Sequence, residues 1–182
     1  GVGNNSMAAL GFQHGKGWFR VPETIHVFVH GTTRNGVTPR DVSQHVVGLM
    51  GEDSAVYKAI EYGGPYIQAL EIEDRMLFPL MSIDLGAKAS YVNPDAKTFA
   101  YAHAHSPVKD FEMPANDAVV QYEKIIDIDV SPLEPQVACP PSVGNVKPIG
   151  EVAGIPIQIA EIGGSTSSDP TKARGMVAQA AD

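Results

Sequence analysis

Apolar residues along the chain recur at two spacings, one typical of strands and the other typical of helices. The clearest strand signal is the β-branched and aromatic run at 24–30, which stops at Gly31 and places His26 and His30 on the same face. Strict alternation at 126–130 predicts a half-buried strand. Further strands are expected at 56–62 and 155–162, and a short one within 86–92 that ends at Val92.

Helix signals separate these strands. The strongest lies at 39–50, because Thr38 is a good N-cap, Pro39 takes the first helical position and Gly51 follows the last apolar residue. Asp95 is expected to cap a later helix. Further helices are expected at 6–15, 66–70 and 72–83, through Phe99 and Tyr101, and after Pro170. Strands that alternate with helices predict an α/β fold with a parallel or mixed sheet.

The pattern changes at 106–118, a polar stretch with prolines and no periodicity that is expected to form a surface connection. It separates an α/β region at 1–105 from a second α/β segment at 119–182. Within the second segment, 133–148 contains four prolines and is expected to be an extended loop. The first methionine is Met7 and the last residues look helical, so we expect the sequence to be a piece of something longer.

Composition narrows the classes of function. With 182 residues, 43% of them hydrophobic, the chain can bury a core of its own. Its net charge of −8 disfavours nucleic acid, whose phosphates an acidic surface repels. No stretch approaches the roughly 18 apolar residues of a membrane span. The single cysteine, Cys139, cannot form an intrachain disulfide, and this composition indicates a cytoplasmic protein.

The segment with the most chemical character is the last one, where an expected strand runs into Gly163-Gly164-Ser165-Thr166-Ser167-Ser168 before a helix. Such a loop directs backbone N–H groups and hydroxyls toward the positive end of the helix. This arrangement suits a carboxylate, a phosphate or the edge of a cofactor. Loops of this kind also serve simply as helix caps, so both interpretations stay open on the residues alone.

Other candidates lack a full set of partners. Two histidine pairs could each supply two metal ligands, but no acidic residue or cysteine lies at a diagnostic spacing from either. Carboxylates on a helix could form a catalytic pair but are more often solvated, and Cys139 has no nearby histidine to activate it. The pairs are His26 with His30, His103 with His105 in an extended segment, and Asp84 with Glu73 or Asp74.

Several segments, read in order, resemble the aconitase superfamily and in particular the large subunit of 3-isopropylmalate dehydratase. They are GVGNNSMAA, GKGWFRVPETIHV, GVTPRDVSQHVVGLMG, AIEYGGPYIQAL, EDRMLFPLMSIDLGAKASYVNPD, IDVSPLEPQVACPPSVGNVKPIGEV and IAEIGGSTSS. The resemblance implies a layered α/β/α domain of the aconitase iron–sulfur type. It also implies a hydro-lyase that isomerises a hydroxy-di- or tricarboxylic acid by dehydration and rehydration on a 4Fe-4S cluster. The expected partners are a small-carboxylate substrate and a small subunit or the remaining domains.

The sequence departs from the family at its site. Ser165 stands where the family has its first cluster cysteine, followed by a retained Thr166, and a serine hydroxyl is a poor replacement for a thiolate on iron. Leu80 and Asp84 stand where the family has an asparagine and a glutamate of the active site. Leucine cannot form a hydrogen bond, and the shorter aspartate moves a carboxylate by about an ångström.

The resemblance therefore implies catalytic positions at Asp84, Ser165 and Thr166, and substrate or anion binding at Gly163, Gly164 and Ser167. No cofactor is expected in this chain alone, because its cysteine content does not supply the cluster ligands. The leading hypothesis is a fragment or relative of the hydro-lyase that is inactive by itself. The alternative is a catalytically silent scaffold or a module that binds a small carboxylate, and a third hypothesis is a small metal-binding protein that uses the histidine pairs.

Overall fold

The computed structural model describes residues 5–17, 20–117 and 119–161. The chain divides into two compact units, Gly1–Ile149 and Gly150–Asp182. The helices are α1 (Asn5–His14), α2 (Pro39–Met50), α3 (Pro65–Ala69), α4 (Ile72–Arg75), α5 (Leu77–Met81), α6 (Ala96–His105) and α7 (Ile149–Val152). The strands are β1 (Thr24–His30), β2 (Ala59–Gly63), β3 (Ala89–Val92), β4 (Lys124–Asp129), β5 (Gln136–Ala138) and β6 (Val146–Pro148).

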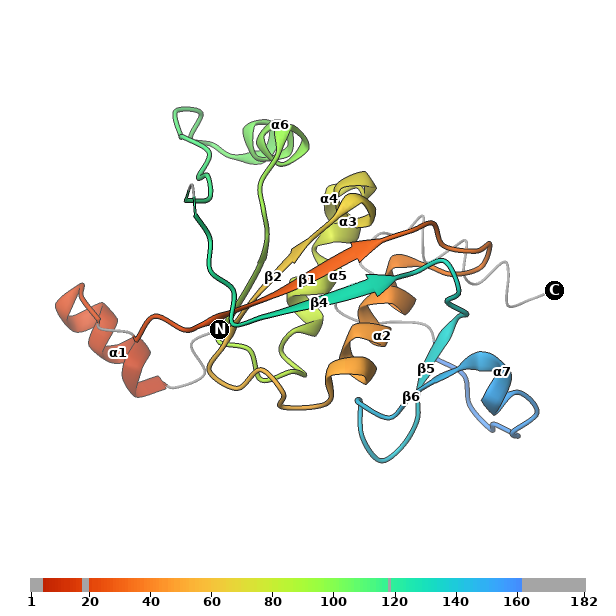
Figure 1. Cartoon of the computed structure of the whole chain (residues 1–182). Coiled ribbons are helices and arrows are strands. Elements are labelled where there is room, and N and C mark those ends of the chain that lie inside the picture. The colour runs from red at the N-terminus through yellow and green to blue at the C-terminus, as the bar shows by residue number, and fades with distance from the viewer. Residues whose placement is uncertain (1–4, 18–19, 118, 162–182) are drawn as a thin grey trace. The chain divides into compact units, whose positions relative to one another are not determined.

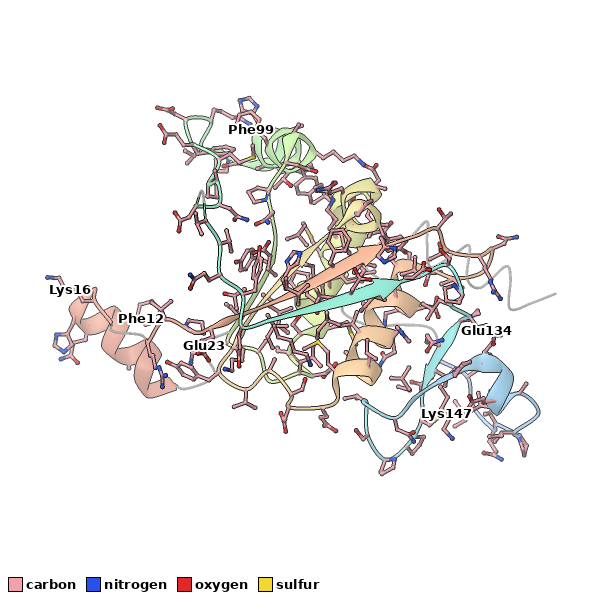
Figure 2. The ribbon with its side chains drawn as sticks, in the orientation of Figure 1. Phe12, Lys16, Glu23, Phe99, Glu134 and Lys147 are labelled. Carbon is pink, nitrogen blue, oxygen red and sulfur yellow. The ribbon has the colours of Figure 1, made fainter. Side chains whose placement is uncertain are left out.

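The first unit is built on a four-stranded sheet in the order β3-β2-β1-β4, and every pairing in it is parallel. Figure 1 shows β1, β2 and β4 side by side with α2 and α5 along the sheet. Parallel neighbours need long crossover connections, and the helices between successive strands provide them. The predicted α/β fold with a parallel sheet is confirmed.

The core lies between the sheet and its helices. Along β1 the residues alternate between buried and half-buried, as a strand with one face on a core requires. The buried face of β1 packs in one apolar cluster with the buried side chains of α2. These side chains are Ile25, Val27 and Val29 on β1 and Val42, Val46 and Val47 on α2.

Helix α2 begins as predicted. The Thr38 side chain accepts a hydrogen bond from the backbone N–H of Asp41, and the Asp41 carboxylate accepts from the backbone N–H of Thr38 at 2.8 Å. This capping box satisfies two N–H groups that the first turn leaves without a helical partner. Asp95 likewise caps α6, where its side chain accepts from the backbone N–H of Thr98 at 3.0 Å.

The single helix predicted at 72–83 is wrong, because the structure divides it into α4 and α5 at Met76. Pro79 explains the division, since proline has no N–H to donate to the carbonyl of Arg75 four residues earlier. The chain stays coiled beyond α5, with the backbone N–H groups of Asp84 and Gly86 bonded to carbonyls three residues before them.

The extended loop predicted at 133–148 is also wrong, because it contains the antiparallel pair β5 and β6. The prolines lie at or outside the ends of these strands and leave the central N–H groups free to pair. A further bond just beyond the strands joins the N–H of Cys139 to the carbonyl of Asn145 at 2.8 Å. Helix α2 packs closely on this pair at Gly48, where an added Cβ would lie 2.6 Å from Val146 Cβ.

The strand predicted at 155–162 is not found in its described part, 155–161. Alternating isoleucines form a strand only where a neighbouring strand completes the hydrogen bonds, and Pro156 has no N–H to contribute. The isoleucines at 155, 157 and 159 are instead 64%, 73% and 77% exposed. Within the described ranges, every helix is too short or too polar to cross a membrane.

Candidate functional site

The most developed polar site surrounds Glu61, a carboxylate in the middle of β2 that is only 1% exposed. Its Oε1 accepts hydrogen bonds from Asn93 Nδ2 at 2.6 Å and from the Tyr122 hydroxyl at 2.8 Å, and its Oε2 accepts one from the Tyr91 hydroxyl at 3.2 Å. A buried carboxylate is tolerated only when donors replace its lost water. We call Glu61, Tyr91, Asn93, Tyr122 and His26 the Glu61 cluster.

His26 joins the cluster from the neighbouring strand β1, in register with Glu61. Its Nδ1 lies 3.4 Å from Glu61 Oε1 without the geometry of a hydrogen bond, and its ring stacks on Tyr122 at 4.6 Å between centroids. A Cβ at Gly63 would lie 2.8 Å from His26 Cε1, so the ring occupies the space that a side chain at this position would need.

The tyrosines of the cluster are held in their neutral, proton-donating form. Burial raises the pKa of Tyr122 to about 12, and its hydrogen bond to the negative Glu61 acts in the same direction. Burial and the charge of Glu61 also raise the pKa of Tyr91. With both oxygens of Glu61 occupied by donors, the cluster is suited to fixing segments of the chain and leaves little capacity to bind a ligand or transfer a proton.

A second polar group lies where β1 and β4 end. His30 Nε2 contacts Asp127 Oδ1 at 2.9 Å, and Asp129 accepts from the backbone N–H of Ser131 at 2.9 Å. The hydrogen bonds from Ser131 lower the pKa of Asp129. A Cβ at Gly31 would lie 2.3 Å from Asp129 Oδ1, so the two strand ends approach closely at a glycine with a φ of +95°.

The histidine pairs do not come together as metal ligands. His26 and His30 lie on one face of β1 as predicted, but each has a different partner, Glu61 and Asp127. The extended arrangement considered for His103 and His105 is wrong, because both lie in α6, where residues two apart point in different directions. Among the described residues, no group of three or more His, Cys, Asp or Glu could hold a metal ion.

The positions that the family resemblance singled out lie on α5 and just beyond it. Leu80 is 43% exposed on α5, and Asp84 is half-buried in the following turn. The described residues provide no hydrogen bond or ion pair to the Asp84 side chain. Its carboxylate is therefore free to meet a group from outside, whereas Glu73 lies on α4, at the other end of the coiled segment.

The remaining predicted site residues, Gly163, Gly164, Ser165, Thr166 and Ser167, lie outside the described residues. Cys139 is described and half-buried, and its thiol lies 4.0 Å from the carbonyl oxygen of Val137. A 4Fe-4S cluster takes thiolate ligands, of which this chain has one. The residues present do not fit the cluster, because one thiolate cannot hold it.

Neither the Glu61 cluster nor a buried arginine was predicted from the sequence. Arg75 is 3% exposed; it donates through Nε to the Leu70 carbonyl at 3.1 Å and through Nη2 to the Gln68 carbonyl at 2.7 Å, and it pairs with Asp95 at 2.8 Å. This pair joins the start of α6 to the end of α4. One signal was present for Glu61, namely a charged residue inside an otherwise apolar strand.

Comparison with known proteins gives a family match over most of the chain. The model of the aconitase family, described as aconitate hydratase, matches residues 1–175. The chain is 44% identical over 168 residues to 3-isopropylmalate dehydratase large subunit 1 of Methanopyrus kandleri, covering 92% of this chain and 40% of the relative. It is 40% identical over 167 residues to the probable 3-isopropylmalate dehydratase large subunit of Methanothermobacter thermautotrophicus, covering 92% and 39%.

A probable methanogen homoaconitase large subunit from Methanothermobacter thermautotrophicus is 36% identical over 167 residues, covering 92% of this chain and 39% of the relative. The chain thus spans about two fifths of the length of the curated relatives that it matches.

Proposed function

Because this chain belongs to the aconitase family, we propose that it forms part of the large subunit of a hydro-lyase of the 3-isopropylmalate dehydratase type. The observation that carries the proposal is the identity of 40–44% to two such large subunits across 92% of the chain. The reaction would isomerise a hydroxycarboxylic acid by removing water and adding it back. The remaining part of the large subunit and a small subunit would be needed for it.

Of the three family positions in this chain, one keeps a group that could serve the reaction and two do not. Asp84 would present an accessible carboxylate at the position of the family's glutamate, where it can accept or donate a proton. Leu80 cannot form the hydrogen bonds of the family's asparagine, and Ser165 offers iron a hydroxyl in place of a thiolate. We propose that this chain is inactive alone and that a cluster bound near Ser165 would lack one of its protein ligands.

The second candidate is a catalytically silent relative that acts as a scaffold or binds a small carboxylate. The combined differences at Leu80, Asp84 and Ser165 favour it, because they fall at three separate positions of the family's site. The collinear match over the rest of the chain favours an intact fold under either candidate. The two differ in whether the assembled protein holds a cluster and turns over substrate.

The test uses a chimera in which this chain replaces the matched region of the Methanopyrus kandleri large subunit, produced with that enzyme's small subunit. After anaerobic reconstitution with iron and sulfide, we would measure bound iron, visible absorbance and turnover of 3-isopropylmalate. The matched variant is Ser165→Cys in the same chimera. A cluster and turnover with Ser165 in place support the hydro-lyase, and a cluster only in Ser165→Cys supports the silent relative. A folded chimera that binds no cluster in either form contradicts the proposal.

A further inference from the structure

The coiled segment at 76–85, which contains α5, is apolar on two sides. Its inner side carries Phe78, Met81 and Leu85, spaced three and four residues apart and 0%, 7% and 0% exposed. This spacing places one stripe against the core, as expected of any helix that packs on a sheet. The inner stripe accounts for the position of α5 in the first unit.

The outer side repeats the same spacing, but its side chains are exposed. Met76, Leu80 and Ile83 are also spaced four and three residues apart and are 51%, 43% and 70% exposed. No charged residue lies between Arg75 and Asp84 along this segment. A helix on the surface of a protein normally carries charged or polar residues on its outer side, and one that is apolar all round is normally buried.

The composition of α5 is therefore that of a helix between two layers, although the described residues provide only the inner one. Apolar residues that are exposed together mark surfaces that another protein segment covers. Asp84 lies one turn beyond Leu80 at the end of this stripe, with no partner for its carboxylate among the described residues. A matching surface would be apolar and would bring a cation or hydrogen-bond donor to Asp84.

We propose that the outer side of the α5 segment (76–85), formed by Met76, Leu80 and Ile83, is an interface covered by large-subunit polypeptide from outside the region matched here. This inference rests on the proposed function. The matched relatives have about three fifths of their length outside the aligned region, which supplies ample polypeptide for a second layer. A second copy of this chain is a poorer occupant, because two chains that each carry a charge of −8 repel one another.

The experiment places the same substitution in two contexts. Ile83→Lys is introduced into the isolated chain and into the Methanopyrus kandleri chimera described above, and urea unfolding is followed by circular dichroism. In the isolated chain Ile83 is exposed, so the equilibrium constant for unfolding should change by less than about threefold. In the chimera the lysine would be buried without a partner, and the constant should rise by at least about tenfold. Met76→Lys repeats the test about two turns earlier along the stripe.

The control is Val108→Lys, because Val108 is 59% exposed in the connection after α6, away from α5. It should leave both proteins within about threefold of their parents. If Ile83→Lys and Met76→Lys are harmless in a folded chimera, the interface is refuted while the proposed function stands. If they destabilise the isolated chain equally, or abolish a self-association of that chain, the proposed occupant is wrong. A parent chimera that does not fold contradicts both proposals.

Discussion

Replacing Glu61 with leucine should destabilise the first unit severely, although leucine is close to glutamate in size. The carboxylate is 1% exposed and accepts hydrogen bonds from Tyr91, Asn93 and Tyr122. Tyr91 lies on the edge strand β3, and Asn93 lies in the turn directly after it. Tyr122 lies two residues before the start of β4. Glu61 thus joins β2 to two distant stretches of the chain, the end of β3 and the residues just before β4, and an apolar side chain would join neither.

The expected loss can be worked from the contacts. A hydrogen bond to a charged group contributes roughly 1.5–3 kcal/mol, so three such bonds give roughly 4.5–9 kcal/mol as an upper limit. Tyr91 is 39% exposed and can return its hydroxyl to water, and burial of the leucine contributes about 1 kcal/mol more than burial of the two glutamate methylenes that it replaces. We therefore expect Glu61→Leu to lower the free energy of unfolding by about 3–5 kcal/mol.

Urea unfolding followed by circular dichroism measures this change. With a slope of about 2 kcal/mol per molar urea, a loss of about 4 kcal/mol moves the midpoint down by about 2 M. The matched control is Asp127→Asn, since Asp127 lies on the same face of the sheet with its side chain 66% exposed and should change stability by less than about 1 kcal/mol. Because Glu61→Leu could prevent folding, Tyr122→Phe tests one hydrogen bond at a cost of about 1–2 kcal/mol. Losses below about 1 kcal/mol in both Glu61→Leu and Tyr122→Phe would refute the reasoning.

Three further predictions concern positions whose geometry is equally specific. The hydrogen bond from Arg75 holds the pKa of Asp95 at about 2, below its ordinary 3.8, so the pair's stabilisation is present above about pH 4 and is lost as the pH falls toward 2. Screening of this partly exposed carboxylate limits the loss to about 1 kcal/mol, and urea midpoints measured across this range should lose that step in Asp95→Asn. Gly64→Ala should be far more destabilising in thermal melts than Gly36→Ala, because both have φ near +90° but only at Gly64 would the new Cβ lie 2.3 Å from a carbonyl oxygen of β1; equal melting temperatures would contradict this. In an ultraviolet titration one tyrosine that ionises near pH 12 should disappear in Tyr122→Phe, and stability should fall as the pH rises from about 10 toward 12, since burial favours the neutral phenol; loss of a group that ionises near pH 10 instead would show that Tyr122 has an ordinary pKa.

The sequence predicted those elements whose signals are local. Thr38, Pro39 and Asp41 are close enough to define the start of α2 by themselves, and the structure contains the capping box that they form. The run at 24–30 likewise became β1, because β-branched residues that end at a glycine have few alternatives. Predictions failed where the outcome depends on a distant partner, as for the exposed isoleucines at 155–159 and the hairpin formed by β5 and β6.

The Glu61 cluster could not be predicted from the sequence either, because it too depends on partners that are distant along the chain. Its donors lie 30, 32 and 61 residues from Glu61, and nothing local to Tyr122 indicates that its hydroxyl meets a carboxylate on β2. Only the presence of an acid inside an apolar strand could have raised the question. The structural role of a buried carboxylate such as Glu61 therefore becomes clear only when the segments that donate hydrogen bonds to it are known.

The Glu61 cluster and the family positions Leu80 and Asp84 differ in whether their polar groups have hydrogen-bond partners within the chain. In the Glu61 cluster the carboxylate has three hydrogen-bond donors from within the chain, so its work is to hold strands and turns in place. At the family positions Leu80 is 43% exposed, and the carboxylate of the half-buried Asp84 has no hydrogen-bond or ion-pair partner among the described residues. The proposed place in a larger subunit accounts for this difference, because chemistry at Leu80 and Asp84 would then depend on polypeptide from outside the region matched here. Substitutions at Glu61 should therefore act on the stability of the chain alone, whereas substitutions along the outer side of α5 should act only when the rest of the subunit is present.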